Sequence, residues 1–108
     1  MSEQDFTAMR KAMREQFPDL MDLTENMLLG DIWKRPGLSP RDRSLVTVAA
    51  LISTYRPTEL RFHLKRAMEN GVTKDELKAA IMHLAFYAGW PAAMTGVHVA
   101  MEVLGDEK

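Results

Sequence analysis

The sequence predicts an all-α protein, a bundle of six helices joined by short loops in one domain that spans residues 1–108. Apolar side chains recur every three or four residues in several segments, which is the spacing of one face of a helix. Capping residues mark two helix starts, at Ser39 and at Thr73. No segment alternates apolar and polar residues as a half-buried strand does. Short loops between helical segments favour a helix bundle.

The first two helices are expected in the first third of the chain. An apolar stripe predicts a helix over residues 5–17, and Pro18 stops it because proline cannot continue a helix. The stripe consists of Phe6, Met9, Met13 and Phe17. Asp19 is expected to cap a second helix toward Trp33, which Gly30 weakens. The apolar face of this helix holds Leu20, Leu23, Met27 and Leu28.

The third helix is expected from Pro40 to about Thr54. Ser39 is its predicted N-cap, Pro40 occupies the first helical position, and Asp42 complements the helix dipole. Small and β-branched residues over 46–52 would also suit a strand, but the length and the cap favour a buried helix.

Three more helices follow. The break at residues 56–58 starts the fourth, and Asn70-Gly71 is a typical helix end. Thr73 and Glu76 form a capping box that starts the fifth helix. The segment Gly89-Trp90-Pro91 separates it from the sixth, which is expected to end near Leu104.

The composition excludes several classes of protein. The chain has no cysteine, so disulfides, thiolate metal sites and redox-active thiols are excluded. The formal net charge of −1 gives no electrostatic basis for binding nucleic acid or an anionic membrane. The first residues lack a basic segment followed by an apolar one, so we expect no signal peptide and a cytoplasmic location.

One long segment, Ala79 to Met101, contains no charged residue over 23 positions. That length is enough to span a bilayer. Histidines and the sequence Gly89-Trp90-Pro91 interrupt it, so two half-length buried helices are expected instead of a membrane span. A domain this small cannot bury so much apolar surface on every side, and we therefore expect part of it to face another subunit of a homo-oligomer.

Two pairs of residues are candidates for proton transfer. Glu59 and His63 are four residues apart, which places both on one face of a helix. The carboxylate can orient the imidazole as a proton donor or acceptor, or the two can form an ordinary surface pair. His83 and Tyr87 have the same spacing within the uncharged segment. His83 is expected to be a core residue or to line a cavity together with His63.

Other residues are candidates for substrate binding. Arg43 lies in the first turn of the third helix, which suits an anion site but also an ordinary solvated turn. Arg56 precedes the fourth helix and can reach the region of Glu59. Trp90 is either a pocket wall or an interface anchor. The three histidines do not have the spacing of a metal site, so no metal is expected.

Five short blocks follow one another in a recognisable order from about Gly30 to Leu104. They are Trp33-Lys34-Arg35-Pro36-Gly37-Leu38, Arg41-Asp42-Arg43-Ser44-Leu45, Glu59-Leu60-x-x-His63, Asn70-Gly71-Val72-Thr73-x-x-Glu76 and Tyr87-Ala88-Gly89-Trp90-Pro91-Ala92-Ala93. Together they resemble the carboxymuconolactone decarboxylase family, which shares its all-helical fold with AhpD-like alkylhydroperoxidases. The thiol pair of the peroxidases is absent here, which matches the decarboxylase branch. His83 and Trp90 depart from that branch, where glutamine and valine are usual.

The resemblance implies a decarboxylase, a lyase of aromatic catabolism, that removes CO₂ from 4-carboxymuconolactone or a related small cyclic acid. Loss of CO₂ leaves a dienolate spread over the lactone, so no cofactor is implied. His63, held by Glu59, is the implied proton donor, and His83 replaces or assists it. The implied substrate-binding residues are Arg43, Arg56, Tyr87 and Trp90. Family members commonly assemble as trimers or hexamers.

Two other functions remain open at this point. The chain is either a non-thiol AhpD-like protein that acts on another small molecule (a quinone, a lactone or a hydroperoxide), or a non-catalytic oligomeric binding protein.

Overall fold

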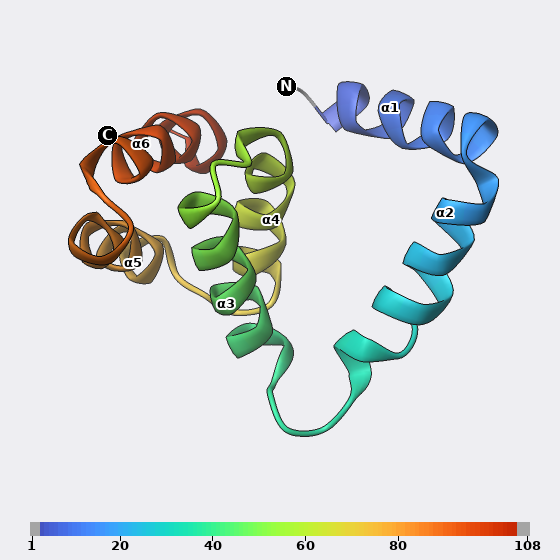
Figure 1. Cartoon of the computed structure of the whole chain (residues 1–108), viewed down its shortest axis with the longest axis horizontal. Helices are drawn as coiled ribbons and strands as arrows, with labels where there is room; N and C mark the ends of the chain where they lie inside the picture. Colours follow the sequence, from blue (N-terminus) through green and yellow to red (C-terminus); the bar gives the residue numbers. More distant parts are fainter. Residues whose placement is uncertain (1–2, 106–108) are drawn as a thin grey trace. The chain divides into compact units, whose positions relative to one another are not determined.

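The structure, a computed structural model, describes residues 3–105 of the chain. It contains six α-helices, one π-helical segment and one 3₁₀ turn, and no strand within those residues. The predicted all-α fold is therefore confirmed. The chain divides into two compact units, the first ending at Leu38 and the second beginning at Ser39 (Figure 1). The single domain expected over residues 1–108 stays a prediction.

The first unit consists of four consecutive helical segments: α1 (Glu3–Gln16), α2 (Pro18–Leu23), the π-helix η1 (Thr24–Leu29) and the 3₁₀ turn η2 (Ile32–Lys34). Arg14 joins α1 to the segments that follow, with Nη2 at 2.9 Å from a carboxylate oxygen of Asp22 and 3.1 Å from one of Glu25. The predicted cap at Asp19 is wrong. Phe17 is the N-cap of α2, since Pro18 takes the first helical position and the helix therefore starts before Asp19.

The sequence predicted one α-helix running toward Trp33, and this prediction is wrong. The helix widens into a π-helix at Thr24, whose Oγ1 donates to the carbonyl oxygen of Leu20 at 2.9 Å. The widened turn closes at Gly30. A Cβ atom there would lie 2.7 Å from the carbonyl oxygen of Asn26, closer than real side chains approach. Gly30 is therefore required by the tight backbone, where the sequence suggested only a weak point in a helix.

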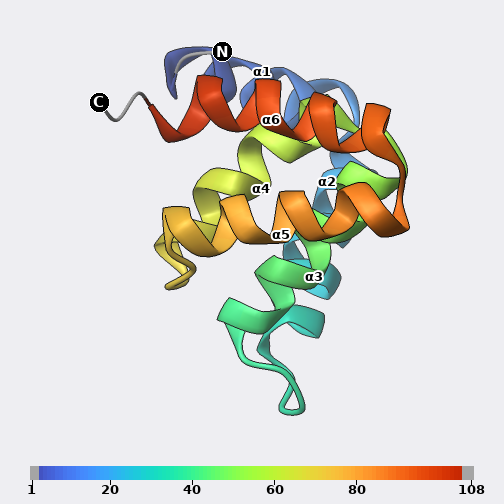
Figure 2. The same cartoon turned by 90° about the vertical axis from the view of Figure 1, so that its left-hand side faces the viewer.

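The second unit contains four consecutive helices: α3 (Pro40–Ser53), α4 (Pro57–Glu69), α5 (Lys74–Tyr87) and α6 (Trp90–Leu104). Their bounds agree closely with the predicted ones. The Ser39 hydroxyl accepts from the backbone N–H of Asp42 at 3.0 Å, and both hydrogen bonds of the Thr73–Glu76 capping box are present. Figure 2 shows α5 and α6 side by side and running in opposite directions.

The core of the second unit draws residues from all four helices. Its buried apolar side chains are Val48, Ile52, Leu60, Leu64, Ala67, Val72, Leu77, Ile81, Ala93, Val99, Ala100 and Leu104. Gly96 lets α6 approach α3 closely, because a Cβ atom there would lie 3.3 Å from Cδ1 of Ile52. Helix α4 buries Leu60, Leu64 and Ala67, and this periodic face determines which of its side chains point away from the core.

Polar contacts tie these helices together at their ends. Arg41 in α3 forms an ion pair with Glu76 at the start of α5. Arg61 in α4 places its Nε 2.9 Å from Oε2 of Glu102 in α6. Both pairs are partly solvent-exposed, so each contributes modestly to stability, although together they fix the helix ends relative to the shared core.

The uncharged segment of residues 79–101 forms the end of α5 and most of α6, as two helices rather than one. No described helix is both long enough and apolar enough to cross a membrane. Several of its large apolar side chains are exposed: Met82, Phe86, Tyr87, Trp90, Met94 and Met101. The expectation that another subunit covers part of this segment stays a prediction.

Candidate functional site

Helix α4 presents Glu59, His63 and Arg66 at successive turns. Arg56 is its N-cap residue and Pro57 occupies the first turn, so the helix begins where the sequence predicts. Glu59 is exposed, whereas His63 and Arg66 are half-buried beside the core-facing residues. The spacing of four and then three residues places the three side chains on neighbouring positions of one helix face. This face is the candidate functional site.

The surroundings of the His63 imidazole favour its neutral form. Burial is the main cause that lowers the pKa of His63 below its ordinary value, because a charged ring loses hydration there. The nearby Arg66 cation lowers this pKa further, and the Glu59 carboxylate opposes both effects by raising it. Glu59 therefore favours the charged ring of His63, as the residue spacing predicts, but its effect on this pKa is smaller than that of burial.

Phe62 and Arg66 are two of the residues that influence the histidine. The rings of Phe62 and His63 meet edge to face, with centroids 5.0 Å apart. The Arg66 guanidinium carbon lies 5.9 Å from the centroid of the Phe62 ring, within the range of a cation–π contact. Sequence reasoning missed both residues, although the three-residue step from His63 to Arg66 was a usable signal.

Two arginines predicted to bind substrate lie at helix starts. Arg43 is half-buried in the first turns of α3, and its carbonyl oxygen accepts from Oγ1 of Thr47 at 2.8 Å. Arg56 is exposed immediately before α4. Arg41, by contrast, is engaged by Glu76 and by Asp42. Since α3 packs against α4, Arg43 belongs to the same pair of helices as His63.

His83 and Tyr87 lie on the exposed side of α5. Their rings contact each other with centroids 4.8 Å apart, and Tyr87 is 78% exposed. Next to them Trp90, at the start of α6, meets Phe86 edge to face at 5.5 Å and is 59% exposed. Of the two alternatives left open for His83, a place in the core is wrong, because His83 is exposed and α5 buries the face that carries Leu77 and Ile81. The alternative that His83 lines a cavity together with His63 stays a prediction.

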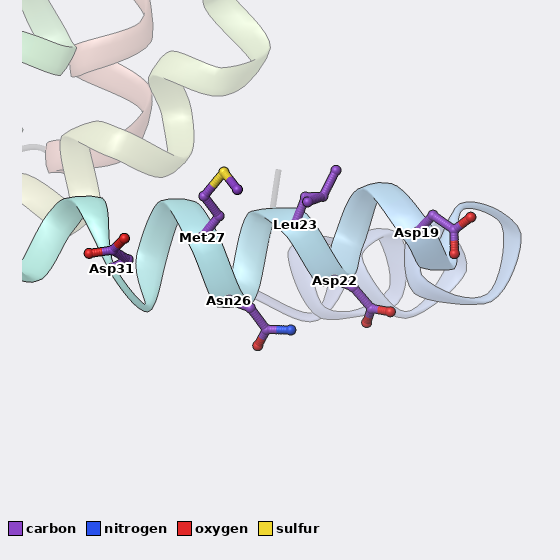
Figure 3. Close-up of a pocket in the computed structure, with 6 residues that line it drawn as sticks. All are labelled: Asp19, Asp22, Leu23, Asn26, Met27 and Asp31. Carbon is purple, nitrogen blue, oxygen red and sulfur yellow. The ribbon is translucent and has the colours of Figure 1, made fainter.

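Neither of two depressions that described residues line, one in each unit, contains a predicted site residue. The first follows α2 and η1, where Figure 3 shows acidic and apolar side chains along a single helical stretch. Its six lining residues are Asp19, Asp22, Leu23, Asn26, Met27 and Asp31. The second lies between α5 and α6 and includes Lys74 and Lys78. A cavity shared by His63 and His83 is thus not among them.

The acidic residues of the first depression are partly neutralised. Asp22 pairs with Arg14, and Asp31 accepts from Arg35 at 2.9 Å and 3.0 Å. Hydrogen bonding to Arg35 lowers the pKa of Asp31, because it stabilises the charged carboxylate in an ion pair with Arg35. Within residues 3–105, no group of three or more histidine or acidic side chains is placed to hold a metal ion.

The fold and the α4 residues define an all-α protein with a candidate carboxylate–imidazole site and no cysteine. The model of the carboxymuconolactone decarboxylase family matches residues 18–102, well over half of the chain. The chain belongs to this family, which confirms the resemblance seen in its sequence motifs.

Two curated relatives are similar over most of this chain. One is a 4-carboxymuconolactone decarboxylase from Acinetobacter baylyi, 47% identical over 82% of this chain and 66% of its own length. Another is a nitrosuccinic acid decarboxylase from Metarhizium robertsii, 36% identical over 71% of this chain and 54% of its own length. The aligned part of this chain thus spans less than two thirds of each of these proteins.

Proposed function

We propose that this chain is a decarboxylase that acts on a small carboxylated lactone or a related cyclic acid. The observation that carries the proposal is the 47% identity to a 4-carboxymuconolactone decarboxylase over 82% of the chain. The second relative is also named a decarboxylase, although of a different acid. The Glu59–His63–Arg66 face of α4 supports the proposal because it offers a titratable ring beside fixed charges of both signs.

The reaction breaks the bond between the ring carbon and the carboxylate carbon. CO₂ leaves, and the electron pair passes into the unsaturated lactone as a dienolate. The lactone itself is the electron sink, so the proposed step needs no cofactor. Arg43 and Arg56 are the proposed partners of the substrate carboxylate and of the developing oxyanion, which they stabilise as charge accumulates.

His63 is the proposed donor of the proton that quenches the dienolate. In the free protein burial lowers the pKa of His63, which favours the neutral imidazole. A substrate anion bound nearby raises this pKa, since it favours the charged ring, and His63 then takes up a proton from solvent. Glu59 stabilises the imidazolium until the proton moves to the ring carbon.

The proposed role of His83, Tyr87 and Trp90 depends on the assembly of several copies of the chain. Exposed aromatic side chains in such number are typical of a surface that a second molecule covers. We propose that the chain forms a homo-oligomer, a trimer or a hexamer, through this part of α5 and α6, and that His83 assists catalysis only where another subunit covers it. We also propose that the protein acts in the cytoplasm, in aromatic catabolism.

The test is the loss of substrate absorbance when the purified protein is added to 4-carboxymuconolactone. His63→Gln is expected to lower kcat at least ~100-fold, because it removes the proton donor and keeps a side chain of similar shape. His98→Gln is the matched control, since His98 is an exposed histidine on α6 outside the proposed site. Turnover near that of the unmodified protein in His63→Gln would contradict the assignment.

A further inference from the structure

Phe62 contacts both His63, the proposed proton donor, and Arg66, a cation that acts on the same imidazole. The Phe62 and His63 rings are nearly perpendicular, with an interplanar angle of 87° and centroids 5.0 Å apart. The guanidinium carbon of Arg66 lies 5.9 Å from the centroid of the same Phe62 ring. One aromatic ring therefore meets the imidazole of the candidate site and a charge that influences it.

The places of these residues on α4 account for the arrangement. Consecutive residues of a helix point about 100° apart, so the Phe62 and His63 rings meet only because both side chains lean toward the space between them. Arg66 follows Phe62 by four residues and His63 by three, which makes it a surface neighbour of both. All three side chains are half-buried, beside the residues that α4 packs into the core.

Each contact of the Phe62 ring restricts a group that matters for proton transfer. The edge-to-face contact limits the rotamers of the His63 imidazole, and a proton donor has to point at the atom that receives the proton. The cation–π contact limits the guanidinium of Arg66. The distance of that cation from the imidazole determines how strongly it disfavours the charged ring.

We propose that Phe62 is a positioning residue of the candidate site, whose ring orients the His63 imidazole and holds the Arg66 guanidinium beside it. The effect of Phe62 on the imidazole is a property of the free protein, whereas its effect on turnover rests on the decarboxylase function proposed above. If Phe62 only fills space at the edge of the core, an apolar side chain of similar volume will replace it without effect on the imidazole.

The first test is a double-mutant cycle on the pKa of His63, measured by NMR titration of the imidazole in the full chain. Arg66→Gln removes a cation that lowers this pKa, so the pKa should rise. In a Phe62→Leu background the ring no longer holds the guanidinium, and the same substitution should produce a clearly smaller rise. An equal rise in both backgrounds would overturn the proposal.

Two variants are matched controls for this cycle. Phe62→Tyr keeps the ring and should keep the His63 titration of the unmodified protein. Phe86→Leu makes the same change as Phe62→Leu at a ring of α5 that meets Trp90, and it should leave the pKa of His63 unchanged. Circular dichroism checks the helical content of each variant, and Phe62→Met replaces Phe62→Leu in the cycle if the leucine variant does not fold.

The second test is the turnover of 4-carboxymuconolactone. Phe62→Leu should lower kcat about tenfold and change KM less than about twofold, because the ring acts on the direction of proton transfer and not on binding. Phe62→Tyr should restore kcat. An active protein whose Phe62→Leu variant keeps its kcat would refute the role in turnover. An unmodified protein without activity would contradict the proposed function, and the titrations alone would then decide the role of Phe62.

Discussion

Asn70 donates its side-chain amide hydrogen to the hydroxyl oxygen of Ser44 at 2.9 Å, and Ser44 is fully buried. The bond joins the first turns of α3 to the C-cap of α4. Ser44→Ala removes the acceptor and leaves a partly buried amide without it. We expect the free energy of unfolding to fall by about 1–2 kcal/mol, measured by urea denaturation.

A double-mutant cycle with Asn70→Ala isolates this bond. If the two side chains stabilise the protein through each other, the double variant will lose less than the sum of the two single losses. Strictly additive losses would show that each residue acts independently, with Asn70 contributing only as the helix cap.

Tyr55 occupies a backbone conformation that usually belongs to glycine. Its φ is +60°, and it follows α3 in a closing turn where Arg56 N–H donates to the Leu51 carbonyl at 2.8 Å and Tyr55 N–H to that of Ile52 at 3.2 Å. Tyr55→Gly removes the left-handed strain but frees the unfolded chain, so we expect a net gain of about 0.5–1 kcal/mol in unfolding free energy. The measurement is the midpoint of thermal or urea unfolding.

Tyr55→Ala separates the backbone from the side chain. Alanine keeps the strained φ and loses the phenol ring, which is 62% exposed. It should therefore show no such gain. A gain of equal size in both variants would mean that the exposed ring, and not the backbone, destabilises the native state.

The local signals of the second unit were sufficient to predict its helices. Ser39 and the Thr73–Glu76 pair form their hydrogen bonds as expected, because capping depends on residues within one turn of each other. Gly71 and Gly89 also lie at helix boundaries, as the sequence predicts. Gly71 follows the end of α4 with a φ of 103°, and Gly89 precedes α6 with a φ of 105°.

Other features depend on information that local sequence does not contain. The π-helix at residues 24–29 has no local signature in apolar spacing, and the lowered pKa of His63 arises mainly from burial, which depends on the tertiary fold. The sequence could not decide between the core and a cavity for His83, because its uncharged surroundings suggest burial on every side, whereas α5 buries only one face. The pairing of Glu59 with His63 stays a prediction about function.

The pKa of His63 is expected to lie below that of an exposed histidine in an NMR titration. The unfolded chain, with a histidine pKa of about 6.5, then binds more protons than the folded chain between the two values. Stability is therefore unaffected above about pH 6.5 and falls as the pH drops from there toward the folded pKa. A stability that rises on acidification through this window would contradict the neutral imidazole.

Two charge-removing variants test the causes of this shift. Arg66→Gln removes a cation beside the ring, so the pKa of His63 should rise toward its ordinary value. Glu59→Gln removes the opposing carboxylate, so this pKa should fall further. Shifts in the same direction in both variants would show that the substitutions act by changing the burial of the ring.

Phe86 and Trp90 meet edge to face at 5.5 Å on the exposed part of α5 and α6, and Phe86 is 72% exposed. If this surface is the proposed subunit interface, Phe86→Glu places a charge in it, and the cost of burying that charge should raise the dissociation constant of the oligomer at least ~100-fold. Sedimentation at micromolar concentration should then show monomers, while Phe86→Leu, which keeps the surface apolar, should remain assembled. An unmodified protein that sediments as a monomer, or a Phe86→Glu variant that stays fully assembled, would exclude this face as the interface.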